Sequence, residues 1–434
     1  MKYILLILIL SLLTLQSHPQ TKVKIGKSVE TVYPITPNKT NDLDELLPLE
    51  ALLKERKVVG MGEATHGTKE FFNMKAKMFK FLVTHCGYRI FTIEATYGGT
   101  LKVNDYVLYG KGDVLSAMKG MEFWTWDTEE VKDLIEWMKI YNEGKSENEK
   151  VKFYGFDCQS YKGPANALIE YVKEFDKANL DKFVKGLSVL NDSSYNYFYT
   201  LKPDKASVNG ISQIHEIIAF IREWFRDNEN QYAPLSGRMK FELATHNIES
   251  LEQVILLSSS QYKTAYTRRD SCMAQNIKWI SELEQSKVFA WAHNSHISKN
   301  PKYYFNKYKT MGCYLDEIFG DAYYNAGFVF NQGSFQAIPK AAGKLQEFTV
   351  PVNRKNTLTN ELALTGVDAF FIDLDSSENA LFKVSNQTYN IGALYNPEHA
   401  YAFTEAIIAK KQFDGLIFIN TTTSALPINR KVVK

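Results

Sequence analysis

The sequence has few of the features that mark several protein classes. Its 434 residues include four cysteines, and their wide, irregular spacing contains no C-x-x-C pair or Cys/His cluster of the kind that binds zinc. Basic and acidic residues nearly balance, 51 against 49, and no dense Lys/Arg run occurs. The chain therefore lacks the electrostatic footprint of a nucleic-acid-binding protein, and we predict no nucleic-acid partner.

Other absences concern organisation and catalysis. No internal repeat or low-complexity linker interrupts a composition that is 45% hydrophobic and 23% charged, as in ordinary globular proteins. No G-x-S-x-G elbow occurs, and Ser295 is a weak candidate nucleophile, which argues against a serine hydrolase. Because a chain this long needs no disulfides to bury a core, we predict buried, isolated thiols, although one disulfide remains open. The cysteines are Cys86, Cys158, Cys272 and Cys313.

The first twenty residues have the composition of a secretory signal peptide. Lys2 precedes an apolar run over residues 3–15, and Ser17 supplies a small residue near a cleavage point. The run is shorter than the roughly 20 apolar residues that span a bilayer, so an uncleaved anchor is only the alternative interpretation. We predict that residues 1–20 are removed, that the protein is exported to a periplasm or secreted, and that no stable membrane insertion follows.

Strand and helix signals alternate after a polar leader. Apolar runs at 57–62, 89–94 and 151–156 predict buried strands, and amphipathic stretches at 68–86 and 131–141 predict helices between them. This alternation is typical of a mostly parallel sheet whose helices cover its faces.

Helical spacing dominates the middle of the chain. Apolar residues at this spacing fill three long stretches: 211–225, 241–257 and 273–283. Strand signals then return in four runs: 287–292, 323–330, 367–372 and 415–419. We therefore predict an α/β fold with a mostly parallel central sheet flanked by helices. Residues 45–163 and 286–430 form its catalytic core, and residues 164–285 form a largely helical insertion.

Carboxylates and imidazoles follow the ends of several predicted strands. Each residue alone has an ordinary explanation: a carboxylate after a strand can cap the next helix, and a lone histidine is more often structural than catalytic. Together they gather where open α/β sheets bind ligands, beyond the carboxyl ends of the strands. The residues are Glu63, His66, Glu94, Asp157, His293 and His296.

Two chemistries fit this set of side chains. A histidine beside a carboxylate acts as a general base that deprotonates water, with other polar groups stabilising the oxyanion. Alternatively, two histidines and two carboxylates hold a metal ion, which lowers the pKa of its bound water. The residue types alone leave both readings open.

Three segments resemble the signature segments of the erythromycin esterase family: 62–67, 94–98 and 291–296. Further segments support the resemblance, and these are 126–131, 134–137, 155–157, 269–276 and 413–420. The similarity extends from about residue 45 to the last of these segments, which is nearly the whole mature chain.

The resemblance implies an ester hydrolase with an α/β core, a helical portion and an active site in the cleft between them. In the family pattern His66 is the general base, which activates water without an obligatory metal. Glu63 and Glu94 orient or poise this base and the water. His293 and His296 then polarise the carbonyl or assist the leaving alcohol.

The same resemblance suggests residues that bind the substrate. A basic residue on the first helix lines the cleft in the family. Here it is Lys75, where some characterised members carry arginine, and lysine lacks the planar bidentate geometry of arginine. Tyr97 and Trp126 either line an apolar cleft or pack in the core beside the strand ends. Asp157 and Arg269 complete the predicted substrate-binding set.

We therefore predict an exported carboxylic-ester hydrolase that uses no cofactor and acts on a small-molecule ester. A macrolide lactone is a candidate substrate and antibiotic resistance a candidate role. One alternative is a metal-dependent hydrolase, and another is an exported protein that binds metal or haem, as more distant proteins with this kind of fold do. The metal ligands would be Glu63, His66, Glu94, His293 and His296. The oligomeric state is not predicted.

Overall fold

The computed structural model describes residues 20–191, 207–258, 260, 262–304, 306–340, 343–352 and 357–428. Residues 1–19 of the predicted signal peptide lie outside this range, so its cleavage and the export of the protein remain predictions. Among the described residues, none of the helices combines the length and the apolar character needed to cross a membrane.

A six-stranded parallel region forms the centre of the sheet. Its spatial order is β15–β9–β3–β6–β4–β5, and every neighbouring pair runs parallel. Because the parallel segments of these strands are buried on both faces, their sequences there are nearly continuous apolar runs; the outer half of β9, beyond Asn331, is only partly buried. The strands are β3 (Val58–Met61), β4 (Ile90–Thr96), β5 (Lys152–Asp157), β6 (Val288–Trp291), β9 (Tyr323–Pro339) and β15 (Gly415–Thr422). The predicted, mostly parallel central sheet is thereby confirmed.

Antiparallel strands extend one side of this region. β11 (Ala369–Asp373) pairs with β15, and the hairpin β1 (Thr21–Ile25) and β2 (Ser28–Pro34) continues the sheet beyond it. β10 (Gln346–Val350) pairs antiparallel with β9, whereas the short strand β13 (Leu394–Tyr395) pairs parallel with it. The hairpin lies in the segment that the sequence suggested to be a polar leader.

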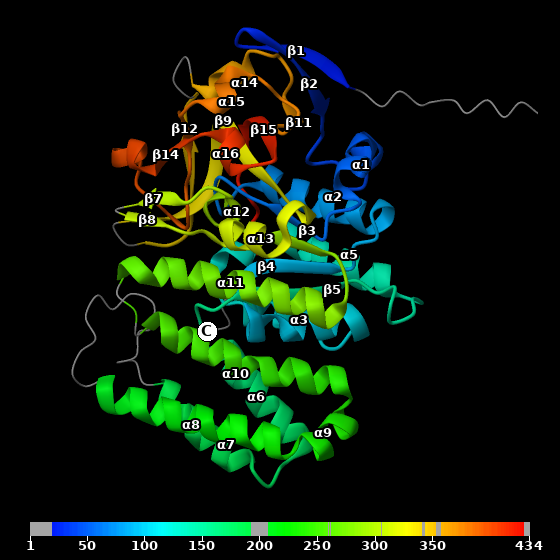
Figure 1. Ribbon diagram of the computed structural model, residues 1–434, viewed down its shortest axis with the longest axis vertical. Helices are drawn as coiled ribbons and strands as arrows, with labels where there is room; N and C mark the ends of the chain where they lie inside the picture. Colours follow the sequence, from blue (N-terminus) through cyan, green and yellow to red (C-terminus); the bar gives the residue numbers. More distant parts are fainter. Residues whose placement is uncertain are drawn as a thin grey trace, which may run out of the picture.

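Helices cover both faces of the sheet (Figure 1). α2 (Lys69–His85) and α5 (Glu129–Asn142) share a hydrophobic cluster with one face. α11 (Tyr262–Glu284) and α13 (Met311–Phe319) share a second cluster with the other face. α3 (Tyr97–Tyr109) packs beside β5 at the edge of the sheet.

Further helices form a layer of their own at the lower end of the molecule (Figure 1). They bury a third hydrophobic cluster and join the rest through α6 and α10, both of which pack against α3. The helices are α6 (Lys162–Phe175), α7 (Leu180–Leu187), α8 (Ser207–Asp227), α9 (Glu229–Ser236) and α10 (Arg238–Ser258). The fold class with its helical part is confirmed, whereas the exact domain boundaries at 164 and 285 stay a prediction. α11 lies inside those boundaries but packs on the sheet.

Candidate active site

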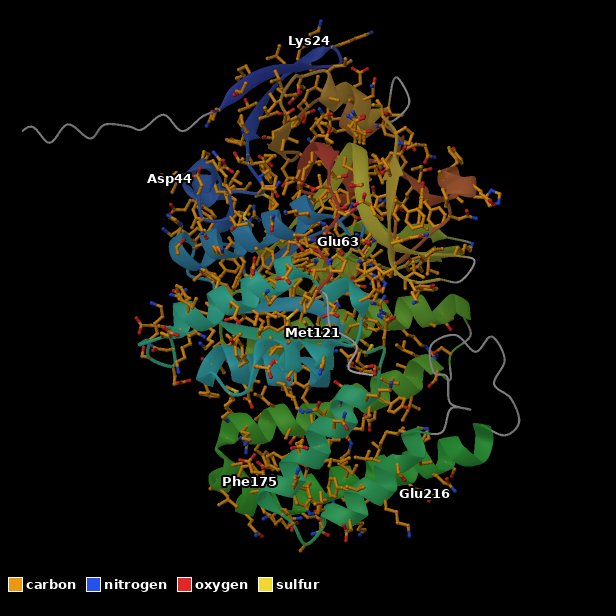
Figure 2. All side chains as sticks on the ribbon, turned by 180° about the vertical axis from the view of Figure 1, so that it is seen from behind. Lys24, Asp44, Glu63, Met121, Phe175 and Glu216 are labelled. Carbon is orange, nitrogen blue, oxygen red and sulfur yellow. The ribbon has the colours of Figure 1, made fainter. Side chains whose placement is uncertain are left out.

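The turn after β3 holds a buried carboxylate. Glu63 is inaccessible to solvent, and Figure 2 places it in the middle of the molecule, with Phe175 and Glu216 at the lower end. Its Oε1 lies 2.6 Å from Nδ1 of His66, and its Oε2 accepts a hydrogen bond of 2.8 Å from Nε1 of Trp291. Both carboxylate oxygens are therefore engaged, and the His66 imidazole is fixed by one of them.

Lys75 supplies the countercharge to Glu63. The side chain extends from the inner face of α2, its ammonium contacts Oε2 of Glu63, and it donates a 3.0 Å hydrogen bond to the carbonyl of Gly62. Burial lowers the pKa of Lys75 to about 8, and the charge of Glu63 opposes this shift. The nitrogen also lies 4.2 Å from the ring centre of Trp291. Lys75 thus contacts Glu63, Gly62 and Trp291, while its role in binding substrate stays a prediction.

Replacing Lys75 with methionine is expected to lower the free energy of unfolding by about 3–5 kcal/mol, because Glu63 then keeps a buried charge without a cation. Urea unfolding followed by circular dichroism measures this loss. The double variant Lys75→Met with Glu63→Gln removes both charges, and we expect it to recover part of the stability. A double variant that is less stable than Lys75→Met alone would show that unpaired charge is not the cause.

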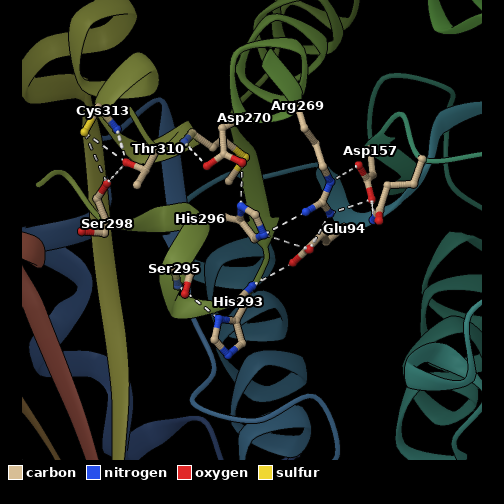
Figure 3. A network of polar contacts seen from close by, with 12 residues as sticks. Glu94, Asp157, Arg269, Asp270, His293, Ser295, His296, Ser298, Thr310 and Cys313 are labelled. Carbon is tan, nitrogen blue, oxygen red and sulfur yellow. Dashed lines mark hydrogen bonds and ion pairs between the residues drawn. The ribbon is translucent and has the colours of Figure 1, made fainter. Parts of the chain in front are cut away.

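A second ionic cluster lies at the ends of the neighbouring strands β4 and β5 (Figure 3). Arg269 on α11 donates from Nε to Oδ1 and from Nη2 to Oδ2 of Asp157, both at 2.8 Å. Its Nη2 also lies 2.7 Å from Oε1 of Glu94. Three buried groups from three elements thus form one network. The bidentate pair with Asp157 fixes the orientation of the Arg269 guanidinium.

The direction of the Glu94 side chain follows from the alternation of β4. Phe91, Ile93 and Ala95 point into the cluster beneath α2 and α5, so Glu94 points to the opposite face, where α11 presents Arg269. Burial by itself would raise the pKa of Glu94. The charges of His296 and Arg269 outweigh burial, and the pKa is held well below its usual range.

His296 lies between two carboxylates (Figure 3). Its Nδ1 is 2.8 Å from Oδ1 of Asp270, and its Nε2 is 3.3 Å from Oε1 of Glu94 and 3.0 Å from Nη1 of Arg269. A protonated ring donates to Glu94, whereas a neutral ring accepts from Arg269. Burial disfavours the charge, but Asp270 and Glu94 outweigh burial and the guanidinium and raise the pKa of His296 to about 9. His296 is therefore a cation at neutral pH.

Asp270 is a site residue that the sequence analysis did not single out. It is fully buried, and its second oxygen accepts a 2.8 Å hydrogen bond from the backbone N–H of Met311 at the start of α13. The only sequence signal is its place next to Arg269 in a segment that resembles the family. Its carboxylate holds the His296 ring from the side opposite Glu94.

His293 connects the two clusters. It precedes the short helix α12 (Asn294–Ile297), and its backbone N–H donates to Oε2 of Glu94 at 2.9 Å. The N–H of Ser295 donates to Nδ1 of His293 at 3.2 Å, so the proton of the neutral ring lies on Nε2. The ring centres of His293 and His66 are 4.9 Å apart. The five predicted catalytic side chains therefore gather in one region at the carboxyl edge of the sheet.

Gly62 allows this close approach. A Cβ atom at this position would lie 2.1 Å from the side-chain oxygen of Asn294, whose backbone N–H donates to the carbonyl of Glu63 at 2.9 Å. The turn after β3 and the turn after β6 can thus touch only because residue 62 has no side chain.

The two predicted aromatic residues lie in different surroundings. Trp126 is buried with its ring centre 6.4 Å from that of His66 and 5.7 Å from that of Trp291, so it borders the site. Tyr97 is also buried, but its hydroxyl donates to the carbonyl of Leu243 and its ring packs on His246. These contacts join α3 to α10, and none of them is with His66, His293 or His296.

Fold and site together define an α/β protein with a buried acid–base cluster at the carboxyl edge of its sheet. The sequence model of the erythromycin esterase family matches residues 83–422. The chain belongs to this family, which confirms the resemblance seen in the sequence. Family membership supports a hydrolase. The matched range includes Glu94, Arg269 and His296 but begins after Glu63 and His66.

Individual relatives agree with this assignment. YbfO of Bacillus subtilis (strain 168) is 23% identical over 410 residues, which cover 88% of this chain and 87% of that protein. Erythromycin esterase type II of Escherichia coli is 25% identical over 325 residues, covering 69% and 74%. A solved structure of a mutant of the erythromycin esterase EreC in its open conformation has a TM-score of 0.66 at 16% identity, covering 92% and 99%. The last comparison concerns the fold.

Proposed function

We propose that the protein hydrolyses a carboxylic ester with water activated by His66. The observation that carries the proposal is the 2.6 Å contact between Oε1 of Glu63 and Nδ1 of His66. A carboxylate at Nδ1 keeps the proton on that nitrogen and leaves Nε2 as the base, which is the arrangement that general-base catalysis requires. The name of the E. coli relative makes a macrolide lactone a candidate substrate.

The remaining groups supply positive character for the oxyanion. Nε2 of His293 carries the proton of the neutral ring, and this ring lies next to His66. His296 and Arg269 add two buried cations behind it. Donors that are fixed before the reaction stabilise the charge that develops on a carbonyl oxygen. In our proposal His293 polarises the carbonyl, and the cation of His296 assists departure of the alcohol.

The metal alternative has weaker geometric support. Its five ligands would be the same glutamates and histidines, but the guanidinium of Arg269 lies against both Glu94 and His296. Both oxygens of Glu63 are engaged by protein donors. Within the described ranges, no group of three or more His, Cys, Asp or Glu side chains is arranged to hold a metal ion. The proposal therefore assigns the chemistry to the side chains alone.

Mass spectrometry of a macrolide and of simple acyl esters after incubation with the purified protein tests the proposal. We expect the gain of one water by at least one of these compounds, at the same rate with and without a chelator. Loss of activity on chelation that one divalent ion restores would favour the metal-dependent reading. If no ester is cleaved and added haem gives a visible absorption band, the protein is a binding protein instead.

We also propose that the protein is exported. Residues 1–20 have the composition of a secretory signal peptide, a segment that directs a chain out of the cytoplasm and is removed from the mature protein. Mass spectrometry of the N-terminus of the protein recovered from extracytoplasmic fractions is expected to show a chain that begins near residue 20. A chain that retains Met1 in the cytoplasm would contradict export and would leave the proposed chemistry unaffected.

Replacing Asp270 with asparagine is expected to lower the pKa of His296 from about 9, because the Asp270 charge is the largest of the effects that raise it. The alkaline limit of ester hydrolysis then moves down by about one pH unit or more. Profiles of kcat against pH measure this shift, and NMR titration of His296 gives a readout independent of turnover. Asp133→Asn, an exposed change on α5, is the control and should move neither curve.

The same shift has a consequence for stability. The pKa of His296 in the folded protein, about 9, exceeds the ordinary value of 6.5. The stabilisation from its two carboxylates is therefore complete below about pH 6.5 and is lost as the pH rises through about 9. Asp270→Asn should flatten this part of the stability curve, and an unchanged slope between these limits would contradict the ion pair.

A further inference from the structure

Two of the four cysteines lie together, directly behind the Asp157–Arg269 ion pair. Cys158 and Cys272 form a small buried cluster with Leu257 of α10, and their thiols share a hydrogen bond. Cys158 follows β5, whereas Cys272 lies on α11. The pair therefore joins two elements that are far apart in the sequence.

The other two thiols have different neighbours. Cys86 packs in the cluster beneath α2, and Cys313 contacts the hydroxyl of Thr310 and the carbonyl of Lys299. All four are free thiols in this structure. If the chain forms one disulfide, Cys158 and Cys272 are therefore the pair that the geometry favours.

We propose that Cys158 and Cys272 are a redox pair that closes to a disulfide when the protein meets a disulfide-containing oxidant such as oxidised glutathione. Cys272 is 8% exposed and Cys158 is fully buried, so Cys272 is the thiol that the oxidant reaches first. The bond would tie the end of β5 to α11.

Exchange proceeds in two balanced steps. The Cys272 thiolate attacks one sulfur of the oxidant, forms a mixed disulfide and releases one thiolate, which takes up the proton that Cys272 lost. Cys158 then loses its proton, attacks the Cys272 sulfur and releases the second thiol. Two protein thiols are oxidised and one external disulfide is reduced to two thiols. The Cys158 thiol lowers the pKa of Cys272 by hydrogen bonding to it, which favours the first step.

The position of the pair explains what the bond would do. The N–H of Cys158 donates to Oδ1 of Asp157 at 2.8 Å, the same oxygen that accepts from Nε of Arg269. Cys272 follows Arg269 by about one helical turn on α11. The disulfide would therefore span the same junction as the ion pair. It would keep Asp157 and Arg269 next to each other by preventing β5 and α11 from moving apart.

The experiment compares the full protein after treatment with oxidised glutathione or with dithiothreitol. Each sample is denatured in N-ethylmaleimide, and its labels are counted by intact mass. We expect two labels after oxidation and four after reduction, and a peptide map should show Cys158 linked to Cys272. Closure of this long loop should raise Tm by about 3–6 °C.

Single serine variants identify the bond. Cys86→Ser and Cys313→Ser should still form the linked peptide and show the Tm rise. Cys158→Ser and Cys272→Ser should lose both, and Cys158→Ser should instead retain a glutathione adduct on Cys272. Four labels after oxidation of the native chain, or a link that includes Cys86 or Cys313, would overturn the proposal. Because mass and Tm are the readouts, the result does not depend on the proposed hydrolase activity.

Discussion

Replacing His66 with asparagine is expected to lower the rate of ester hydrolysis by about 10²–10⁴-fold, the usual contribution of a general base. Asparagine has no basic nitrogen, so it cannot take a proton from water at any pH in the working range. The fold should tolerate the change because the His66 side chain is partly exposed and Glu63 keeps its bonds to Lys75 and Trp291. We therefore expect a lower kcat and a melting temperature close to that of the native protein.

The matched control for this variant is His215→Asn, which changes an exposed histidine on α8 in the helical layer. It should leave both kcat and Tm unchanged. Initial rates on the ester identified by mass spectrometry, together with calorimetry, provide the two readouts. If His66→Asn retained a tenth or more of the native kcat, the base would have to be another group, and the dyad with Glu63 would be structural.

The fold was predictable where burial leaves a continuous apolar pattern. β3, β4 and β5 lie between two helical layers, so their apolar runs stand out in the sequence. The β1–β2 hairpin does not stand out, because its strands lie at the edge of the sheet and only Val23, Ile25 and Val32 of them are buried. The outer half of β9 does not stand out either, since polar residues and a glycine follow Phe330 and only Phe335 and Ala337 are buried beyond Asn331.

α3 shows how packing can override local propensity. Its first turn contains Gly98 and Gly99, which weaken a helix in isolation. In the fold a Cβ at Gly98 would lie 2.5 Å from the backbone nitrogen of Pro164. The glycines therefore permit the close contact between α3 and α6 that holds the helix in place, and this contact is invisible in the local sequence.

The site was predictable to the extent that it lies at strand ends. Glu63, Glu94 and Asp157 lie in or just after the carboxyl-terminal ends of parallel strands, so their convergence follows from the topology of the sheet. Asp270 could not be found in this way because it lies on α11, within the stretch interpreted as an insertion. Only the packing of α11 on the sheet brings its carboxylate to His296.

The largest loss of stability is expected when Arg269 is replaced with methionine. Its guanidinium is the shared cation of Asp157 and Glu94, and all three groups are almost fully buried. Methionine fills much of the same volume but leaves two carboxylates that lie close together without their guanidinium. Removing one partner from a buried ion pair costs about 3–5 kcal/mol, so we expect a loss in this range or above it.

The free energies of unfolding of Arg269→Met and Arg222→Met, measured in urea, show how much of this loss depends on the burial of the ion pair. Arg222 also contacts two carboxylates, those of Glu249 and Glu252, but its side chain is 45% exposed. Water replaces such contacts, so the control should lose about 1 kcal/mol or less. Arg269→Lys keeps the charge without the planar bidentate geometry and should fall between the two. If Arg269→Met were as stable as Arg222→Met, water or proton uptake by Glu94 would have to replace the guanidinium, and the cluster would not be the rigid support that the proposed chemistry requires.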